Sequence, residues 1–144
     1  LGKNAARVIL PITDPYVVHH GALGSFATAY LSAGANLEDV ISRLAAEPGM
    51  HEVLGRDEAC ARHELPPDRI GDIVVVSRDT KVIGTSANRH DLAALTEPLR
   101  SHGGITEQTV PMIVNRRLED MPEGVRNFDA FAVGLNHVTV TEPV

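Results

Sequence analysis

The chain has 144 residues and a formal net charge of −6, with 43% hydrophobic and 22% charged residues. This balance is typical of a globular domain with its own core, and it excludes a disordered polar segment. The acidic charge argues against binding to a nucleic-acid backbone, and the apolar runs are too short to span a bilayer. Cys60 is the only cysteine, which excludes an intrachain disulfide and fits a reducing, cytoplasmic compartment.

The first half of the sequence predicts alternating strands and helices. Aliphatic and β-branched runs predict strands, and Pro11 places the first of them at a sheet edge or strand end. The clearest helix follows Asn36, a good N-cap, carries apolar residues at helical spacing and stops at Pro48-Gly49. The predicted strands are residues 7–12, 25–31, 51–54 and 73–76, and the predicted helices are 37–47 and 57–63. This β-α-β-α-β order indicates the α/β class.

The second half is less regular. We expect a short helix from His90 to about Pro98, strands at 110–114 and 137–140, and a loop at 121–127, while 128–135 is ambiguous. The composition changes near Gly84. The sequence therefore predicts two segments, 1–84 and 85–144, the second of which carries the motif described next.

His102 is the best-presented candidate ligand. It stands in Arg100-Ser101-His102-Gly103-Gly104, where two residues without Cβ let the backbone turn sharply and approach an ion or an oxyanion. One imidazole nitrogen would then be offered as a metal ligand or a proton carrier. The alternative is a surface turn with an incidental histidine. A zinc site takes three or four protein ligands, so this chain by itself holds at most part of one.

A second candidate site combines Asp14 with His19-His20-Gly21, where a carboxylate and two imidazoles could bind a cation or an anionic substrate. Adjacent residues of an extended chain point to opposite sides, so at most one of the two histidines is expected to be functional. Cys60 lies within a predicted helix beside two alanines, which favours a structural thiol over a nucleophile. The common phosphate-loop, dinucleotide, serine-hydrolase and zinc-protease motifs are absent.

These residues together resemble the C-terminal part of the phosphonoacetate hydrolases, a family of the alkaline phosphatase superfamily. The resemblance covers nearly the whole chain, and the Asp14–Gly24 stretch is specific to the family. The wider superfamily shares a Gly-Asp pair leading a strand, followed later by His-Gly-Gly. The matching stretches are 7–28, 48–49, 56–61, 65–76, 99–104 and 127–131.

The resemblance implies a hydrolase with two zinc ions that splits the carbon–phosphorus bond of phosphonoacetate into acetate and phosphate. It makes His102 a zinc ligand, 1–84 a cap-like α/β segment and 85–144 a return to an alkaline-phosphatase-type core. One of His20, His19 or Arg7 is then expected to reach the substrate carboxylate from the cap side. The family's threonine nucleophile and its Asp-His-Gly ligands have no counterpart here.

The chain begins at Leu1 rather than Met, and we expect it to be part of a longer polypeptide that is inactive without the rest. Its expected partners are a small phosphonate and the remainder of that polypeptide, with a homo-oligomer left open. Two other functions remain open at this point. One is a phosphodiesterase or nucleotide pyrophosphatase of the same superfamily, and the other is a non-catalytic α/β cap or interaction module.

Overall fold

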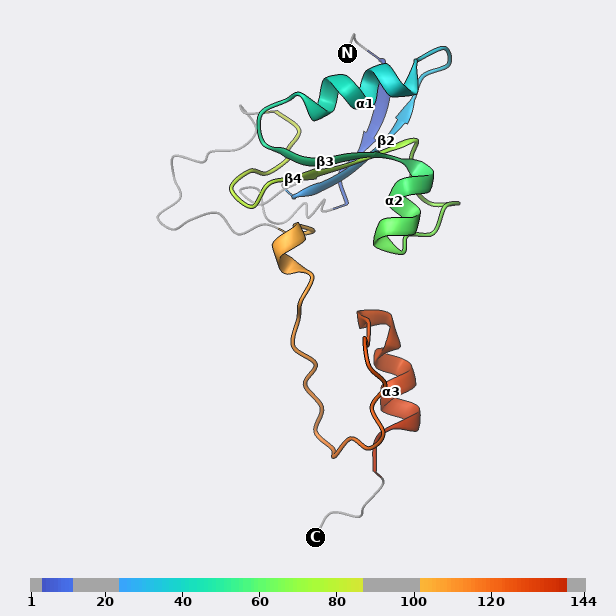
Figure 1. The fold of residues 1–144 in the computed structure, drawn as a ribbon, viewed down its shortest axis with the longest axis vertical. Helices are drawn as coiled ribbons and strands as arrows, with labels where there is room; N and C mark the ends of the chain where they lie inside the picture. Colours follow the sequence, from blue (N-terminus) through green and yellow to red (C-terminus); the bar gives the residue numbers. More distant parts are fainter. Residues whose placement is uncertain (1–3, 12–23, 87–101, 140–144) are drawn as a thin grey trace. The chain divides into compact units, whose positions relative to one another are not determined.

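The computed structural model describes residues 4–11, 24–86 and 102–139 (Figure 1). The contacts of the chain divide it into two compact units, 1–109 and 110–144. The division that the sequence predicted, into segments 1–84 and 85–144, stays a prediction. In the structure, the loop that begins at His102 belongs to the first unit, because its backbone is hydrogen-bonded to Ser25.

The first unit is built on a four-stranded sheet. The strands are β1 (Ala6–Ile9), β2 (Phe26–Leu31), β3 (Met50–Gly55) and β4 (Ile73–Ser77), and their order across the sheet is β1-β2-β4-β3. Every neighbouring pair is antiparallel. β4 runs between β2 and β3 and is apolar from Ile73 to Val76, and its Ile73 and Val74 are fully buried, as the sequence predicted for this run.

Two helices lie on opposite faces of this sheet (Figure 1). α1 (Leu37–Ala45) is capped by Asn36, whose side-chain oxygen accepts a hydrogen bond from the Asp39 N–H at 3.0 Å. α1 approaches the sheet at Gly55, where an added Cβ would meet the Ile41 side chain at 3.7 Å. α2 (Arg56–His63) begins directly after β3. The mixed α/β class and the helix positions are therefore confirmed, with an antiparallel sheet.

The core lies between α2 and the sheet. Side chains of one face of β3 and β4 pack there against Ala59 of α2, which is fully buried. The period of two along a strand places Leu54, Val74 and Val76 on the same face, so alternation accounts for this core. The complete cluster is Leu54, Ala59, Ile70, Val74 and Val76, flanked by Phe26, Cys60 and Leu65.

Gly71 and Asp72 fasten the start of β4 to its neighbours. Gly71 has no room for a side chain, because a Cβ there would lie 2.4 Å from the Ala29 carbonyl oxygen. Its N–H donates to Thr28 Oγ1 at 2.8 Å. The Asp72 carboxylate accepts from the Leu31 N–H at 2.8 Å and from the Arg56 guanidinium at 2.7 Å. The Gly-Asp pair thus joins β2, β4 and the first turn of α2.

The second unit has little internal core. It contains a short 3-10 turn (Asn127–Asp129) and α3 (Ala130–Asn136), and an isolated bridge pairs Leu118 with Val138. Val133 of α3 is buried, whereas Phe131 and Leu135 are each 83% exposed. The ambiguous stretch 128–135 is therefore mainly helical.

The predicted strand at 110–114 is wrong. These residues have no strand structure, and Ile113 is 87% exposed. A strand needs a neighbour to pair with its backbone groups, and the described part of the chain pairs none with this run. Of the predicted strand at 137–140, the described residues form only one isolated bridge, at Val138. The helix predicted from His90 lies outside the described residues.

Within the described ranges, no helix combines the length and apolarity needed to cross a membrane.

We predict that Gly71→Ala lowers the free energy of unfolding by at least about 2 kcal/mol, because its Cβ meets backbone that cannot move without breaking the β2–β4 pairing. Urea unfolding of the purified chain measures this. Gly55→Ala is the matched control, since its Cβ makes only ordinary contacts, and we expect a change below about 1 kcal/mol. Equal effects of the two substitutions would contradict this explanation of Gly71.

Candidate functional site

The ring of His102 is presented to solvent. His102 is exposed, and its ring makes no hydrogen bond to any residue that the structure describes. Its main chain is fixed, because the His102 carbonyl accepts a hydrogen bond from the Ser25 N–H at 2.8 Å. This combination of a fixed backbone and an open imidazole suits a metal ligand.

The two glycines after His102 have different reasons to be glycine. Gly103 has φ +76°, and a Cβ there would lie 3.0 Å from Phe26 Cβ, so an L side chain is disfavoured by both conformation and space. Gly104 has φ −81°, and its Cβ would meet Ser25 at 3.4 Å, which is close to ordinary contact. Gly103 is thus the position that allows the loop to lie against β2.

The start of β2 is firmly held in turn. The Ser25 carbonyl accepts from the Ser77 N–H at 2.8 Å, and Gly24 exchanges both backbone hydrogen bonds with Ile83 at 3.1 and 2.7 Å. Ser77 is fully buried, and its hydroxyl donates to the Lys81 carbonyl at 2.7 Å. Sequence reasoning did not find this anchor, because Ser25 and His102 are far apart in the chain and neither local pattern reveals the other.

The residues in view do not complete a metal site. No group of three or more His, Cys, Asp and Glu side chains in the described ranges is arranged to hold an ion. One exposed imidazole fits one coordination position, and zinc needs further ligands from elsewhere. The donor set therefore agrees with a chain that supplies part of a site.

Arg7 lies on the edge strand β1, with its guanidinium carbon 4.8 Å from the centre of the Tyr30 ring. Arg7 and Tyr30 are register partners in the β1–β2 pair. Because Tyr30 is five residues from Ser25 along β2, Arg7 lies roughly 17 Å along the sheet from the His102 anchor, at about 3.3 Å per residue. The structure does not bring Arg7 and His102 together.

His19 and His20 lie outside the described residues. The first described residue after them is Gly24, which pairs with Ile83 and is followed by the Ser25 anchor of His102. In the sequence, His19 and His20 precede that anchor by only a few residues.

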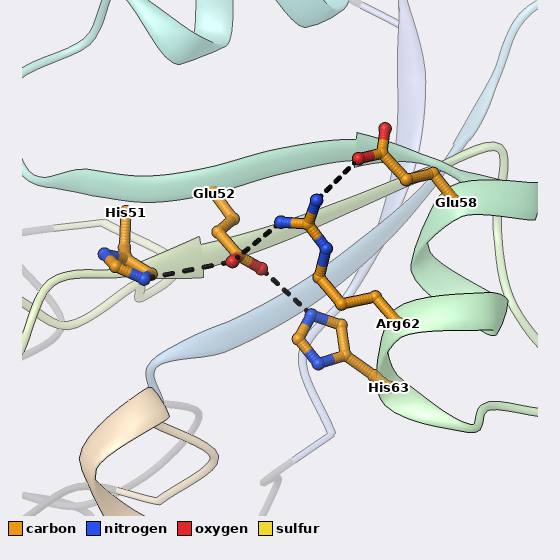
Figure 2. A network of polar contacts seen from close by, with 5 residues as sticks. All are labelled: His51, Glu52, Glu58, Arg62 and His63. Atoms are coloured by element: carbon orange, nitrogen blue, oxygen red, sulfur yellow. Dashed lines mark hydrogen bonds and ion pairs between the residues drawn. The ribbon is translucent and has the colours of Figure 1, made fainter.

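A polar network that the sequence analysis missed joins β3 to α2 (Figure 2). Glu52 accepts hydrogen bonds from Arg62 and His63, both at 3.0 Å, and Arg62 also contacts Glu58 at 2.8 Å. A bulge between Met50 and Glu52 turns His51 toward the same carboxylate, with its Nε2 3.9 Å from Glu52 Oε1. Only the Glu58–Arg62 spacing of four residues was visible in the sequence.

The Glu52 carboxylate is stabilised in its charged form by this network. Burial raises the pKa of Glu52, but hydrogen bonds from Arg62 and His63 and the positive charge of Arg62 outweigh burial, so the pKa lies below its ordinary value. The Glu52 and His63 side chains are 15% and 14% exposed, whereas that of Arg62 is 47% exposed, so solvent screens the Arg62 contact more than the His63 contact. The network holds α2 on β3 and is not arranged as a catalytic site.

The solved structures that are similar to this chain include two of one enzyme. Both are of phosphonoacetate hydrolase from Sinorhizobium meliloti 1021, one in complex with phosphonoacetate and one with phosphonoformate. Each is 68% identical to this chain with a TM-score of 0.74, and the match covers 91% of this chain. The chain spans 32% of the length of those hydrolases, so it is a close homologue of one part of that enzyme. No protein-family model matches the sequence.

We predict that Glu52→Gln lowers the free energy of unfolding by about 1–2 kcal/mol at pH 7, because a half-buried carboxylate loses charged hydrogen bonds. The folded-state pKa is depressed, so this stabilisation is complete above the unfolded pKa of about 4.3 and is lost as the pH falls through the folded value. Urea unfolding of both proteins between pH 7 and pH 3 should show their difference shrink below pH 4.3.

The matched control is Glu58→Gln, whose side chain is 58% exposed and contacts the same arginine. We expect it to change stability by less than about 0.5 kcal/mol. A Glu52→Gln effect that stays constant down to pH 3 would show that the charge of Glu52 is not what stabilises the network.

Proposed function

We propose, from its close homology to one third of phosphonoacetate hydrolase, that this chain forms part of a zinc-dependent enzyme that cleaves the carbon–phosphorus bond of phosphonoacetate. Water is consumed, and acetate and phosphate are released. The chain supplies a metal ligand, His102, and on its own it lacks the nucleophile and the other ligands. The observation that carries the proposal is the 68% identity to hydrolases solved with phosphonoacetate and phosphonoformate.

The presentation of His102 supports its role as a zinc ligand. Its imidazole is exposed while its carbonyl is fixed to β2, and the neighbouring residues that the structure describes leave the ring without a competing hydrogen bond. When bound, two zinc ions would stabilise the negative oxygens of the phosphonate and the attacking group. The contribution of this chain to that chemistry is to hold one coordination position.

The surface of the second unit supports the view that the chain is completed by other residues. Large apolar side chains are exposed throughout this unit, and exposed apolar surface of this extent marks a site of interaction. We propose that they pack against the remaining part of the hydrolase, in an alkaline-phosphatase-type core to which 85–144 returns while 1–84 forms a cap. The exposed side chains are Val110, Met112, Ile113, Val114, Met121, Phe128, Phe131 and Leu135.

For the substrate carboxylate we propose a histidine, His20 or His19, with Arg7 as the third candidate. Phosphonoacetate is only a few bonds long, so its carboxylate must be bound close to the metal ligands. The Arg7 guanidinium rests on the Tyr30 ring and would have to leave it to reach a substrate beside His102. The two histidines precede Gly24 by only a few residues, next to the His102 anchor. A reducing, cytoplasmic location for the enzyme is consistent with Cys60, the one cysteine of this chain.

The proposal is tested in a hybrid hydrolase, in which this chain replaces the third of the S. meliloti enzyme that it matches. We predict that the hybrid binds zinc and releases phosphate from phosphonoacetate, and that His102→Ala lowers its zinc affinity at least about tenfold and abolishes most of its activity. His51→Ala is the control, because it removes another partly exposed imidazole, from the β3 bulge.

Zinc content is measured by elemental analysis and activity by phosphate release, with nucleotide diesters as a second substrate panel. Unchanged zinc affinity in His102→Ala would remove His102 from the metal site. A folded hybrid that hydrolyses diesters but not phosphonoacetate would replace the proposed reaction with that of another enzyme of the superfamily.

In the same hybrid we predict that His20→Ala or His19→Ala raises KM for phosphonoacetate about tenfold or more while zinc affinity is retained, since a lost charged hydrogen bond to the substrate costs about 1.5 kcal/mol or more. Arg7→Ala should raise KM less than the more effective of the two histidine substitutions. Steady-state kinetics decide. If none of the three variants changes KM, the carboxylate is bound by residues outside this chain.

A further inference from the structure

We infer that Ser25 and Phe26, at the start of β2, are positioning residues that hold His102 in the orientation required for zinc, an inference that rests on the proposed function. Neither residue carries a group that would touch the metal or the substrate in this role. Each acts through the backbone of the loop 102–104, and their contacts with it differ in kind.

Ser25 divides its two backbone groups between different neighbours. Its carbonyl accepts from the Ser77 N–H of β4, whereas its N–H donates to the His102 carbonyl at 2.8 Å. In a regular antiparallel ladder, two directly opposed hydrogen-bonded residues exchange both bonds. Ser25 and Ser77 share only one, and the second donor is directed to the loop. The end of the β2–β4 ladder thus provides the attachment point of His102.

Phe26 supplies the wall against which the loop turns. Gly103 adopts φ +76° with its α-carbon so close to Phe26 that an added Cβ would lie 3.0 Å from Phe26 Cβ and 3.7 Å from its backbone nitrogen. The left-handed conformation reverses the chain immediately after His102. The direction in which the imidazole leaves the loop is therefore set by residues on both of its sides.

The support behind this anchor is rigid. Ser77 is fully buried and Ser25 is 5% exposed, and the Gly24–Ile83 bridge closes the ladder next to them. A ligand held in advance binds metal more tightly than one that must be ordered on binding, because less ordering entropy is lost when the metal binds. The anchor is thus expected to affect zinc affinity more than the stability of the fold.

A first test uses the 144-residue chain. Hydrogen exchange should show the Ser25 amide protected, and Gly103→Ala should remove that protection while the amides of β4 stay protected. Gly104→Ala is the matched control, because it adds the same methyl group at the next residue, where φ is −81°. Equal Ser25 protection in Gly103→Ala and the unsubstituted chain would contradict the proposed role of Phe26 and Gly103.

The decisive test measures zinc affinity in the hybrid hydrolase by competition with a chelator. Ser25→Pro deletes the N–H that holds His102 and is expected to lower zinc affinity about tenfold or more, whereas Ser25→Ala keeps that N–H and should lower it far less. Gly103→Ala should lower zinc affinity by a similar factor to Ser25→Pro. It therefore replaces Ser25→Pro as the test if the proline variant fails to fold.

A stability control separates positioning from general loosening. Asp72→Asn weakens the attachment of β4 at its other end and should lower the melting temperature without lowering zinc affinity. If zinc affinity falls in proportion to melting temperature across all these variants, or stays within twofold in both Ser25→Pro and Gly103→Ala, the inference is wrong. An unsubstituted hybrid that folds but binds no zinc would instead overturn the proposed function.

Discussion

The hydrogen bond from the Ser25 N–H to the His102 carbonyl is the contact on which the candidate site depends. It connects the loop that begins at His102 to Ser25, the residue directly before β2, and it leaves the imidazole exposed. Without it, His102 would be an unattached surface histidine beside two glycines. With it, the ring projects from a sheet whose central strand is fully buried at Ile73 and Val74. Rigid support of the backbone is what a preorganised metal ligand needs, and the exposed ring leaves room for a metal.

Strand β4 links the Gly71-Asp72 pair to the His-Gly-Gly motif at His102. Gly71 and Asp72 hold the start of β4 against β2 and α2, through a close backbone approach that no Cβ would allow and a carboxylate shared by two donors. Ser77 ends β4 at the Ser25 anchor. The Gly-Asp pair therefore holds the start of β4, and the end of β4 holds Ser25, to which the His-Gly-Gly loop is hydrogen-bonded. In this account Gly71 and Asp72 are structural, and His102 is the proposed metal ligand.

Features that depend on local chemistry were predictable from the sequence. The Asn36 cap, the apolar stripe of α1 and the burial of β4 each follow from residues close together in the chain, and the glycines correctly indicated an exposed His102 loop. Features that depend on contacts between residues far apart in the chain were not predictable from the sequence. The His51 bulge, the Glu52 network and the Ser25 anchor arise only once β3, α2 and β2 are assembled. The run at 110–114 has the composition of a strand, but composition cannot supply the neighbour that a ladder needs. The zinc-ligand role of His102 stays a prediction.

The central claim is that this chain holds one coordination position of a zinc site through His102. A crystal structure of the hybrid hydrolase, with anomalous data collected at the zinc absorption edge, tests it most directly. The account predicts a zinc peak about 2.0–2.1 Å from an imidazole nitrogen of His102, with the Ser25 hydrogen bond intact. Zinc ions bound in the hybrid while the His102 ring points into solvent, with no metal in contact, would contradict it.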